Sequence, residues 1–159
     1  MQLDDWILAL HVLSAVAAGA ALMLFWILVF ALRRTDLPDT TVGINDVARP
    51  GTAVIAASFL GTIVFGVWLA ISLDRYQLWD AWVLIALVLW AVGFETGRRS
   101  GEAYQRAGDR ARELQAAGET APNAELAALN SSGTGLTMHA LSSVAFVLVL
   151  VDMIWKPWA

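Results

Sequence analysis

The stretch WILALHVLSAVAAGAALMLFWILVFAL, Trp6–Leu32, is apolar throughout except for one histidine, His11, and one serine, Ser14. A helix needs about 20 consecutive apolar residues to cross the hydrocarbon of a bilayer, and this stretch exceeds that length. Asp4 and Asp5 precede it, where a cleaved signal peptide carries basic residues, so we expect it to remain in the mature chain. The stretch predicts a first membrane-spanning helix.

Three further apolar runs follow, at about 52–73, 79–97 and 136–155. The 159-residue chain is 58% hydrophobic and 15% charged, whereas soluble domains are roughly 45–50% apolar. Only helices and closed barrels span a bilayer, and these continuous runs lack the alternation of barrel strands. We therefore predict an all-α, integral membrane four-helix bundle, formed by a single domain over 1–159 with spans at about 6–32, 52–73, 79–97 and 136–155.

The connections between the runs differ in kind. The stretch Thr35–Pro50 contains proline, glycine and three aspartates, which predicts an irregular loop, with Arg49-Pro50-Gly51 as the turn that starts the second helix. Residues 98–135 predict a helical connector: Arg98–Gly118 continues the third helix beyond the membrane, and Ala124–Asn130 adds one or two helical turns.

Basic residues set the expected orientation. The first and third connections carry eight of the ten lysines and arginines, and the other two are Arg75 and Lys156. The positive-inside tendency then predicts that both connections are cytoplasmic, with both termini and the short loop 74–80 outside. The net charge of −4 indicates no nucleic-acid partner, and the absence of cysteine excludes disulfides and thiolate metal sites.

Four ionisable residues fall inside or at the ends of the predicted spans, and such residues must pair or line a cavity. His11 and Asp152 lie near the outer boundary, whereas Glu95 and His139 lie near the inner one. At 1.5 Å per residue the two histidines are roughly 15–20 Å apart along the membrane normal, so they cannot both ligate one haem. We hypothesise that His11 pairs with Asp152, and that His139 pairs with Glu95 or Arg49, as a secondary polar cluster.

Small residues surround His11 at helical spacing. Ser14 and Ala18 share its face of the first helix, and Ala57 and Gly61 form a matching face on the second. Such faces allow close helix packing, or room for a flat cofactor, and spacing alone leaves both readings open. A metal on His11 could take Asp152 and Met153 as further ligands, or a second copy of His11 in a two-fold dimer.

Short motifs carry a resemblance over the first three helices: WILALH at Trp6–His11, RPG at Arg49–Gly51, FGVWLA at Phe65–Ala70 and WVLIALVL at Trp82–Leu89. The chain resembles the small bacterial membrane proteins that include the CopD-like copper-resistance proteins and the HemJ-type protoporphyrinogen oxidases. The resemblance implies a multi-pass protein of the bacterial inner membrane in which His11, with Ser14 on its face, binds haem b or copper. It also makes Arg49 a candidate for binding a haem propionate.

Two classes of function remain open from the sequence. The first is a haem- or copper-binding membrane protein with a redox or metal-handling role. The alternative is a non-catalytic accessory or scaffold subunit of a larger membrane complex. The expected partners are the lipid bilayer and either a second copy of the chain or another membrane protein. The chain lacks a P-loop, a dinucleotide-binding turn and a nucleophile elbow, so an enzymatic activity is not assigned.

Overall fold

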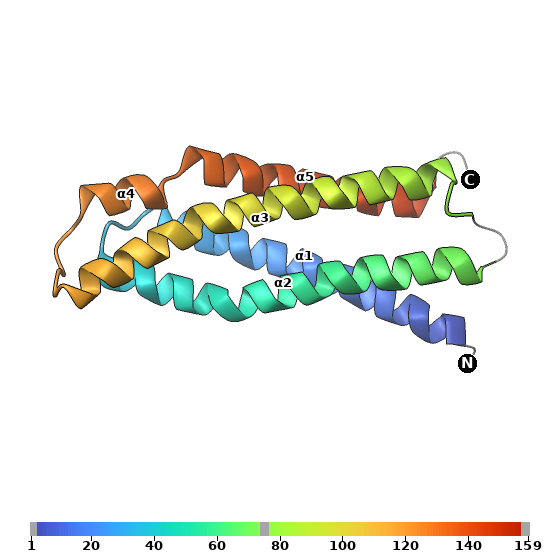
Figure 1. The fold of residues 1–159 in the computed structure, drawn as a ribbon, viewed down its shortest axis with the longest axis horizontal. Helices are drawn as coiled ribbons and strands as arrows, with labels where there is room; N and C mark the ends of the chain where they lie inside the picture. The colour runs from blue at the N-terminus through green and yellow to red at the C-terminus, as the bar shows by residue number, and fades with distance from the viewer. Residues whose placement is uncertain (1–2, 74–76, 157–159) are drawn as a thin grey trace.

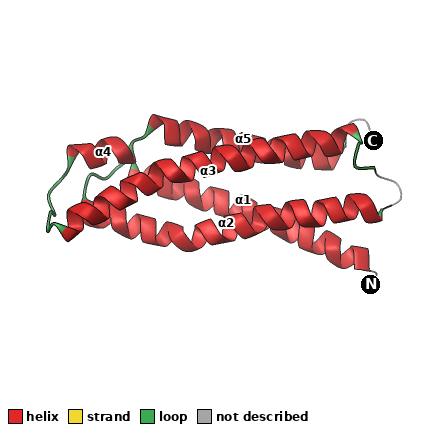
Figure 2. Cartoon of the chain, in the orientation of Figure 1, coloured by secondary structure: helices red, strands yellow, loops and turns green. Residues whose placement is uncertain are grey.

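The computed structural model of the chain describes residues 3–73 and 77–156. Within these ranges it contains five helices: α1 (Leu3–Leu32), α2 (Pro38–Ser72), α3 (Ala81–Ala116), α4 (Ala124–Asn130) and α5 (Gly133–Trp155). Figure 2 shows helices and loops, and no strand, over the described residues. The predicted all-α fold class is confirmed, whereas Arg75 lies outside the described residues.

Four helical runs of the described chain are long and apolar enough to cross a membrane. They are α1, α2, α3 and the run Ala124–Trp155, which includes α4 and α5. Each run overlaps one of the four predicted spans, and by length and composition the four runs indicate a multi-pass membrane protein. Figure 1 shows the two ends of the chain at one end of the molecule, and α4 with the α1–α2 connection at the other.

The four long helices pack as two pairs. α1 packs along α2 and α3 packs along α5, while α2 touches α3 less and α1 touches α5 least. Glycines allow the close approach within each pair: a Cβ atom on Gly61 of α2 would lie 2.5 Å from Oγ of Ser14 on α1, and one on Gly93 of α3 would lie 3.4 Å from Cβ of Ala145 on α5. The predicted small-residue faces of the first two helices therefore meet each other.

The predicted irregular loop at Thr35–Pro50 is wrong. Helix α2 begins at Pro38, where the fixed φ of proline suits the first helical turn, and it continues through Pro50 to Ser72. Its first turns are helical because they pack on the end of α3: a Cβ on Gly108 would lie 2.6 Å from Oδ1 of Asn45. Tertiary contact thus overrides the local preference of a segment that is rich in turn-forming residues.

The end of the molecule opposite the termini forms a small folded unit, which we call the headpiece. It consists of the start of α2 (38–50), the end of α3 (100–116) and α4. Leu126 of α4 packs with Ala111 and Leu114 of α3 and with Val42 of α2. The extension of the third helix and the separate helix at Ala124–Asn130 are both as predicted.

Polar contacts fix the headpiece as well. The buried amide of Asn130 donates from Nδ2 to Oγ1 of Thr41 at 2.8 Å and to the carbonyl oxygen of Thr35 at 3.0 Å. Ion pairs join Arg112 to Asp46 at 3.1 Å and Arg110 to Glu125 at 2.9 Å. The exposed ion pairs contribute less than about 1 kcal/mol each, so the buried contacts of Leu126 and Asn130 hold α4 in place.

Candidate functional site

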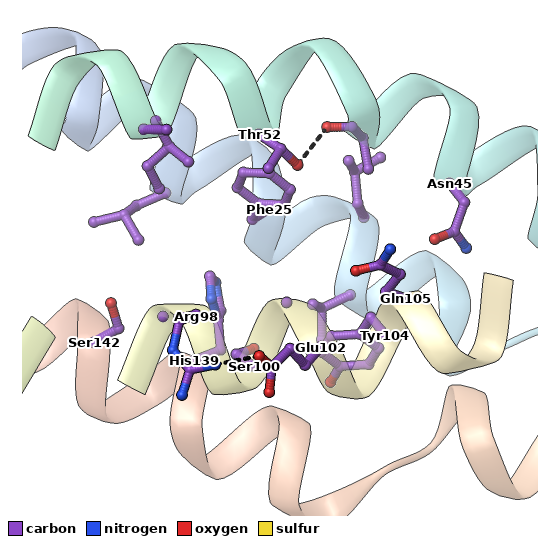
Figure 3. A pocket seen from close by; sticks show the side chains of 18 of the residues that line it. Phe25, Asn45, Thr52, Arg98, Ser100, Glu102, Tyr104, Gln105, His139 and Ser142 are labelled. Atoms are coloured by element: carbon purple, nitrogen blue, oxygen red, sulfur yellow. Dashed lines mark hydrogen bonds and ion pairs between the residues drawn. The ribbon is translucent and has the colours of Figure 1, made fainter. Parts of the chain in front are cut away.

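A cavity of about 900 Å³ lies between the two helix pairs. All four long helices line it, and Figure 3 shows side chains from these helices converging on the space. Towards the middle of the helices its walls are apolar, with Leu22 and Phe25 from α1 and Phe59 from α2. Towards the headpiece they are polar, with Asn45 of α2 and Gln105 of α3 (Figure 3). The cavity therefore has one apolar end and one polar end.

His139 of α5 lines this cavity and is 95% buried, since only 5% of its surface is exposed. Its Nε2 atom has no hydrogen-bond partner in the described part of the chain. The backbone of Leu22 on α1 lies close to the imidazole. A buried nitrogen without a partner costs about 1–3 kcal/mol, and a ligand bonded to it would remove that cost.

Trp26 of α1 packs against His139 where α1 and α5 meet. Its ring meets the imidazole edge on, with 4.6 Å between the ring centroids. The indole Nε1–H donates to Oγ of Ser143 at 3.0 Å, and that hydroxyl donates in turn to the carbonyl oxygen of His139 at 2.9 Å. These contacts hold the imidazole in one orientation at the cavity wall.

Three arginines line the polar end of the cavity. Arg98 pairs with Glu95 at 2.8 Å and with Glu102, and Arg112 pairs with Asp46 at 3.1 Å. Arg49 makes no ion pair with a carboxylate among the described residues. Of these three arginines, Arg49 can therefore bind an anionic ligand without competition from a carboxylate of the described chain.

Tyr104 of α3 closes the cavity at the headpiece. Burial raises the pKa of its hydroxyl above the ordinary value, although Arg33 opposes that change. The ring packs against the start of α5, where a Cβ on Gly135 would lie 3.0 Å from the ring. Tyr104 therefore remains neutral at physiological pH.

His11 lies elsewhere, in the contact between α1 and α2. Its Nδ1 lies 3.0 Å from the carbonyl oxygen of Thr62; because a carbonyl only accepts, Nδ1 carries the proton. The ring lies against Gly66, where a Cβ would be 2.9 Å from Cε1. Glycine at 66 thus lets the imidazole reach a carbonyl one turn earlier in α2. Ser14 is close to the same interface, against Gly61, and donates to the carbonyl oxygen of Leu10 at 2.8 Å.

The hypothesised polar pairs are not what the structure shows. His11 bonds to Thr62 rather than Asp152. Glu95 bonds to Arg98 at 2.8 Å and to Arg99 at 2.7 Å rather than to His139. Glu95 therefore neutralises the arginines next to it on α3.

Asp152 is buried, with 6% of its surface exposed, and its Oδ2 has no hydrogen-bond partner within 3–73 and 77–156. Met153, its neighbour on α5, is half-buried. In the described chain, no group of three or more His, Cys, Asp or Glu side chains is arranged to hold a metal ion. A copper site on His11, Asp152 and Met153 stays a prediction.

The cavity was not predicted from the sequence, although one feature of the sequence pointed towards it. Gly93, Gly97 and Gly101 recur at four-residue spacing along α3, which puts a face without side chains on that helix. In the structure all three glycines line the cavity, and Ser142 of α5 packs against Gly93 and Gly97, donating to the carbonyl oxygen of Gly93 at 2.8 Å. The same face therefore serves both helix packing and the cavity.

No protein-family model matches this chain, and neither a curated protein nor a solved structure matches it. The resemblance to the CopD-like and HemJ-type proteins therefore stays a prediction.

Proposed function

We propose that this protein binds haem b in the cavity between its two helix pairs and serves a redox or haem-handling role in the membrane. The observation that carries the proposal is His139, which lines the cavity and whose buried Nε2 has no hydrogen-bond partner within the described residues. Histidine nitrogen is a common axial ligand of haem iron. His139 then has the ligand role that was predicted for His11.

The other residues of the cavity suit the same ligand. Cofactor sites commonly have volumes of about 300–1,000 Å³ with mostly apolar walls, and this cavity has about 900 Å³ with Leu22, Phe25 and Phe59 on its walls. Arg49, which has no carboxylate partner among the described residues, suits the acidic groups of haem. When bound, haem supplies one-electron chemistry, while the chain orients it and excludes water.

The positive-inside tendency supports one orientation of the protein. The headpiece and the α1–α2 connection carry most of the basic residues, among them Arg33, Arg34, Arg106 and Arg110. We place this end in the cytoplasm and both termini outside, in the plasma membrane of a bacterium. The polar end of the cavity, with Arg49, then lies at the cytoplasmic headgroup level.

The test is a titration of the detergent-purified protein with hemin, followed by absorption spectra of the oxidised and reduced forms. Wild type and His11→Ala are expected to bind hemin, and His139→Ala is expected to lose the spectrum of histidine-ligated haem. His11→Ala is the matched control, since it removes the other imidazole of the chain. Loss of the spectrum in His11→Ala but not in His139→Ala would overturn the assignment in favour of His11.

Metal analysis of the same samples tests the copper alternative. Stoichiometric copper that disappears in His11→Ala would support a copper site at that residue. A wild-type protein that binds neither hemin nor copper would refute this function. The accessory or scaffold role would then be the better proposal, with the folded headpiece as the docking unit.

A further inference from the structure

The exposed residues of the cavity lining lie on α2 and α3. Its lining residues on α1 and α5 are all buried or half-buried, including His139 and Leu22. On α2 and α3, by contrast, many lining residues are exposed: Arg49, Thr52, Ala56, Phe94, Arg98, Gly101, Glu102 and Gln105. We call this opening between α2 and α3 the mouth.

Contacts between α2 and α3 bound the mouth at both ends. At one end the indole of Trp90 donates to the carbonyl oxygen of Phe59 at 3.1 Å. At the other end Gly108 packs tightly on the side chain of Asn45. Between these two levels the cavity separates the helices, and Figure 3 shows the lining side chains in that gap.

Two sequence features keep the mouth open. Pro50 lies inside α2, where it removes one backbone hydrogen bond and its ring crowds the carbonyl one turn earlier, which bends the helix. Figure 1 shows α2 bowed away from α3 in this stretch. On the opposite side, Gly101 has no side chain to fill the space, and a Cβ there would meet no atom within 4 Å.

The mouth crosses from an apolar level to a charged level. At its apolar end are Ala56 and Phe94, whose side chain is 47% exposed. At its charged end, towards the headpiece, are Arg49 and Arg98. This is the change from hydrocarbon to headgroups that a bilayer leaflet presents at its surface. A molecule that fits the whole mouth has an apolar body and an anionic group at one end.

We propose that the cavity takes its ligand sideways from the leaflet next to the headpiece, through the mouth between α2 and α3. The ligand is a membrane-dissolved amphiphile that enters with its apolar body first and leaves its carboxylate or phosphate at Arg49. This inference rests on the proposed function for the presence of a ligand in this cavity, and haem, with its carboxylates, belongs to the class.

Two glycines offer a matched pair of variants for testing the route. A Cβ on either Gly101 or Gly43 would meet no atom within 4 Å, so both helices can accept a large side chain there. Gly101 lines the mouth, whereas Gly43 lies on α2 outside the cavity lining. The protein is reconstituted in phosphatidylcholine and phosphatidylglycerol vesicles and mixed with vesicles that carry hemin. Gly101→Trp should slow hemin uptake at least about tenfold, and Gly43→Trp should match wild type.

A second measurement needs no ligand. The chain has no cysteine, so Ala56→Cys gives a single nitroxide spin label at the apolar end of the mouth. The rate at which the label collides with oxygen, which concentrates in lipid, is compared with the rate at which it collides with a water-soluble nickel chelate. Leu60→Cys, at a position 62% exposed on the same helix, and Gly43→Cys are the lipid and water references. The label at 56 should resemble the label at 60.

Equal uptake rates for Gly101→Trp and Gly43→Trp would overturn the lateral route, as would a label at 56 that favours the nickel chelate. If wild type in detergent binds no hemin, the proposed function fails, and the spin label alone decides the route. Circular dichroism and equilibrium hemin binding in detergent check that Gly101→Trp is folded, so a slow rate is not mistaken for loss of structure.

Discussion

Replacing His139 by leucine should remove hemin binding and leave the stability of the ligand-free protein almost unchanged. Leucine is similar in size and has no polar atom, so it relieves the buried Nε2 that lacks a partner among the described residues. That relief is worth about 1–3 kcal/mol. A structural histidine that satisfied all its hydrogen bonds would behave in the opposite way.

The contacts that His139→Leu removes are worth a similar free energy. The contact of the imidazole with the nearby backbone of Leu22 is worth at most about 1 kcal/mol. The edge-on contact with Trp26, at 4.6 Å between centroids, is worth about 0.5–1.5 kcal/mol. Gain and loss nearly cancel, so we expect the free energy of unfolding of His139→Leu to stay within about 1 kcal/mol of wild type.

The assay is chemical denaturation in detergent micelles, followed by tryptophan fluorescence, on ligand-free wild type, His139→Leu and His11→Leu. A hemin titration of the same three proteins measures binding. Unchanged stability together with lost binding is the expected pattern for His139→Leu. A loss of more than about 3 kcal/mol would mean that the imidazole is a fully bonded structural residue, and retained hemin binding would remove His139 from the site.

Three further predictions concern the charged end of the cavity and the headpiece. Arg49→Gln should weaken hemin binding about tenfold or more in a spectroscopic titration. Arg98→Gln should weaken it less, because Arg98 already pairs with two carboxylates. Equal effects of the two substitutions would contradict the role given to Arg49. Asn130→Ala should destabilise the headpiece by about 2–4 kcal/mol, since it removes two hydrogen bonds and leaves the hydroxyl of Thr41 without this partner. Amide hydrogen exchange in α4 measures this loss of stability, and unchanged protection of the α4 amides would refute the prediction. Burial raises the pKa of the Tyr104 hydroxyl, so above about pH 10 the folded protein keeps a proton that the unfolded chain loses. The free energy of unfolding should therefore fall as the pH rises through that range. The stabilities of wild type and Tyr104→Phe should diverge there in denaturation curves, and parallel pH profiles would exclude this cause.

The membrane spans could be predicted from the sequence because the length of an apolar run is a local property. Trp6–Leu32 needs no neighbour to identify it as a spanning helix. The extension of α3 could be predicted for the same reason, since its composition favours a solvated helix by itself. The small residues beside His11 and at Gly61 indicated close packing, and the structure shows that these two faces touch each other.

Tertiary structure decided what a helical pattern leaves open. Whether α2 begins only after Pro50 or already at Pro38 depends on the contact of Asn45 with Gly108, which lies on another helix. Whether a histidine meets a cavity or a neighbouring backbone depends on which helices pair: His11 faces Gly66 of α2, while His139 lies between the two pairs.

The chain by itself determined a helical membrane protein with most of its basic residues in two of its connections, because hydropathy and charge are properties of the residues alone. The pairing of α1 with α2 and of α3 with α5, and the cavity between the pairs, were decided only in the folded state. The physical reason is that lipid solvates every apolar helix face equally well, so the choice of partner comes from the close packing of particular small residues across the interface.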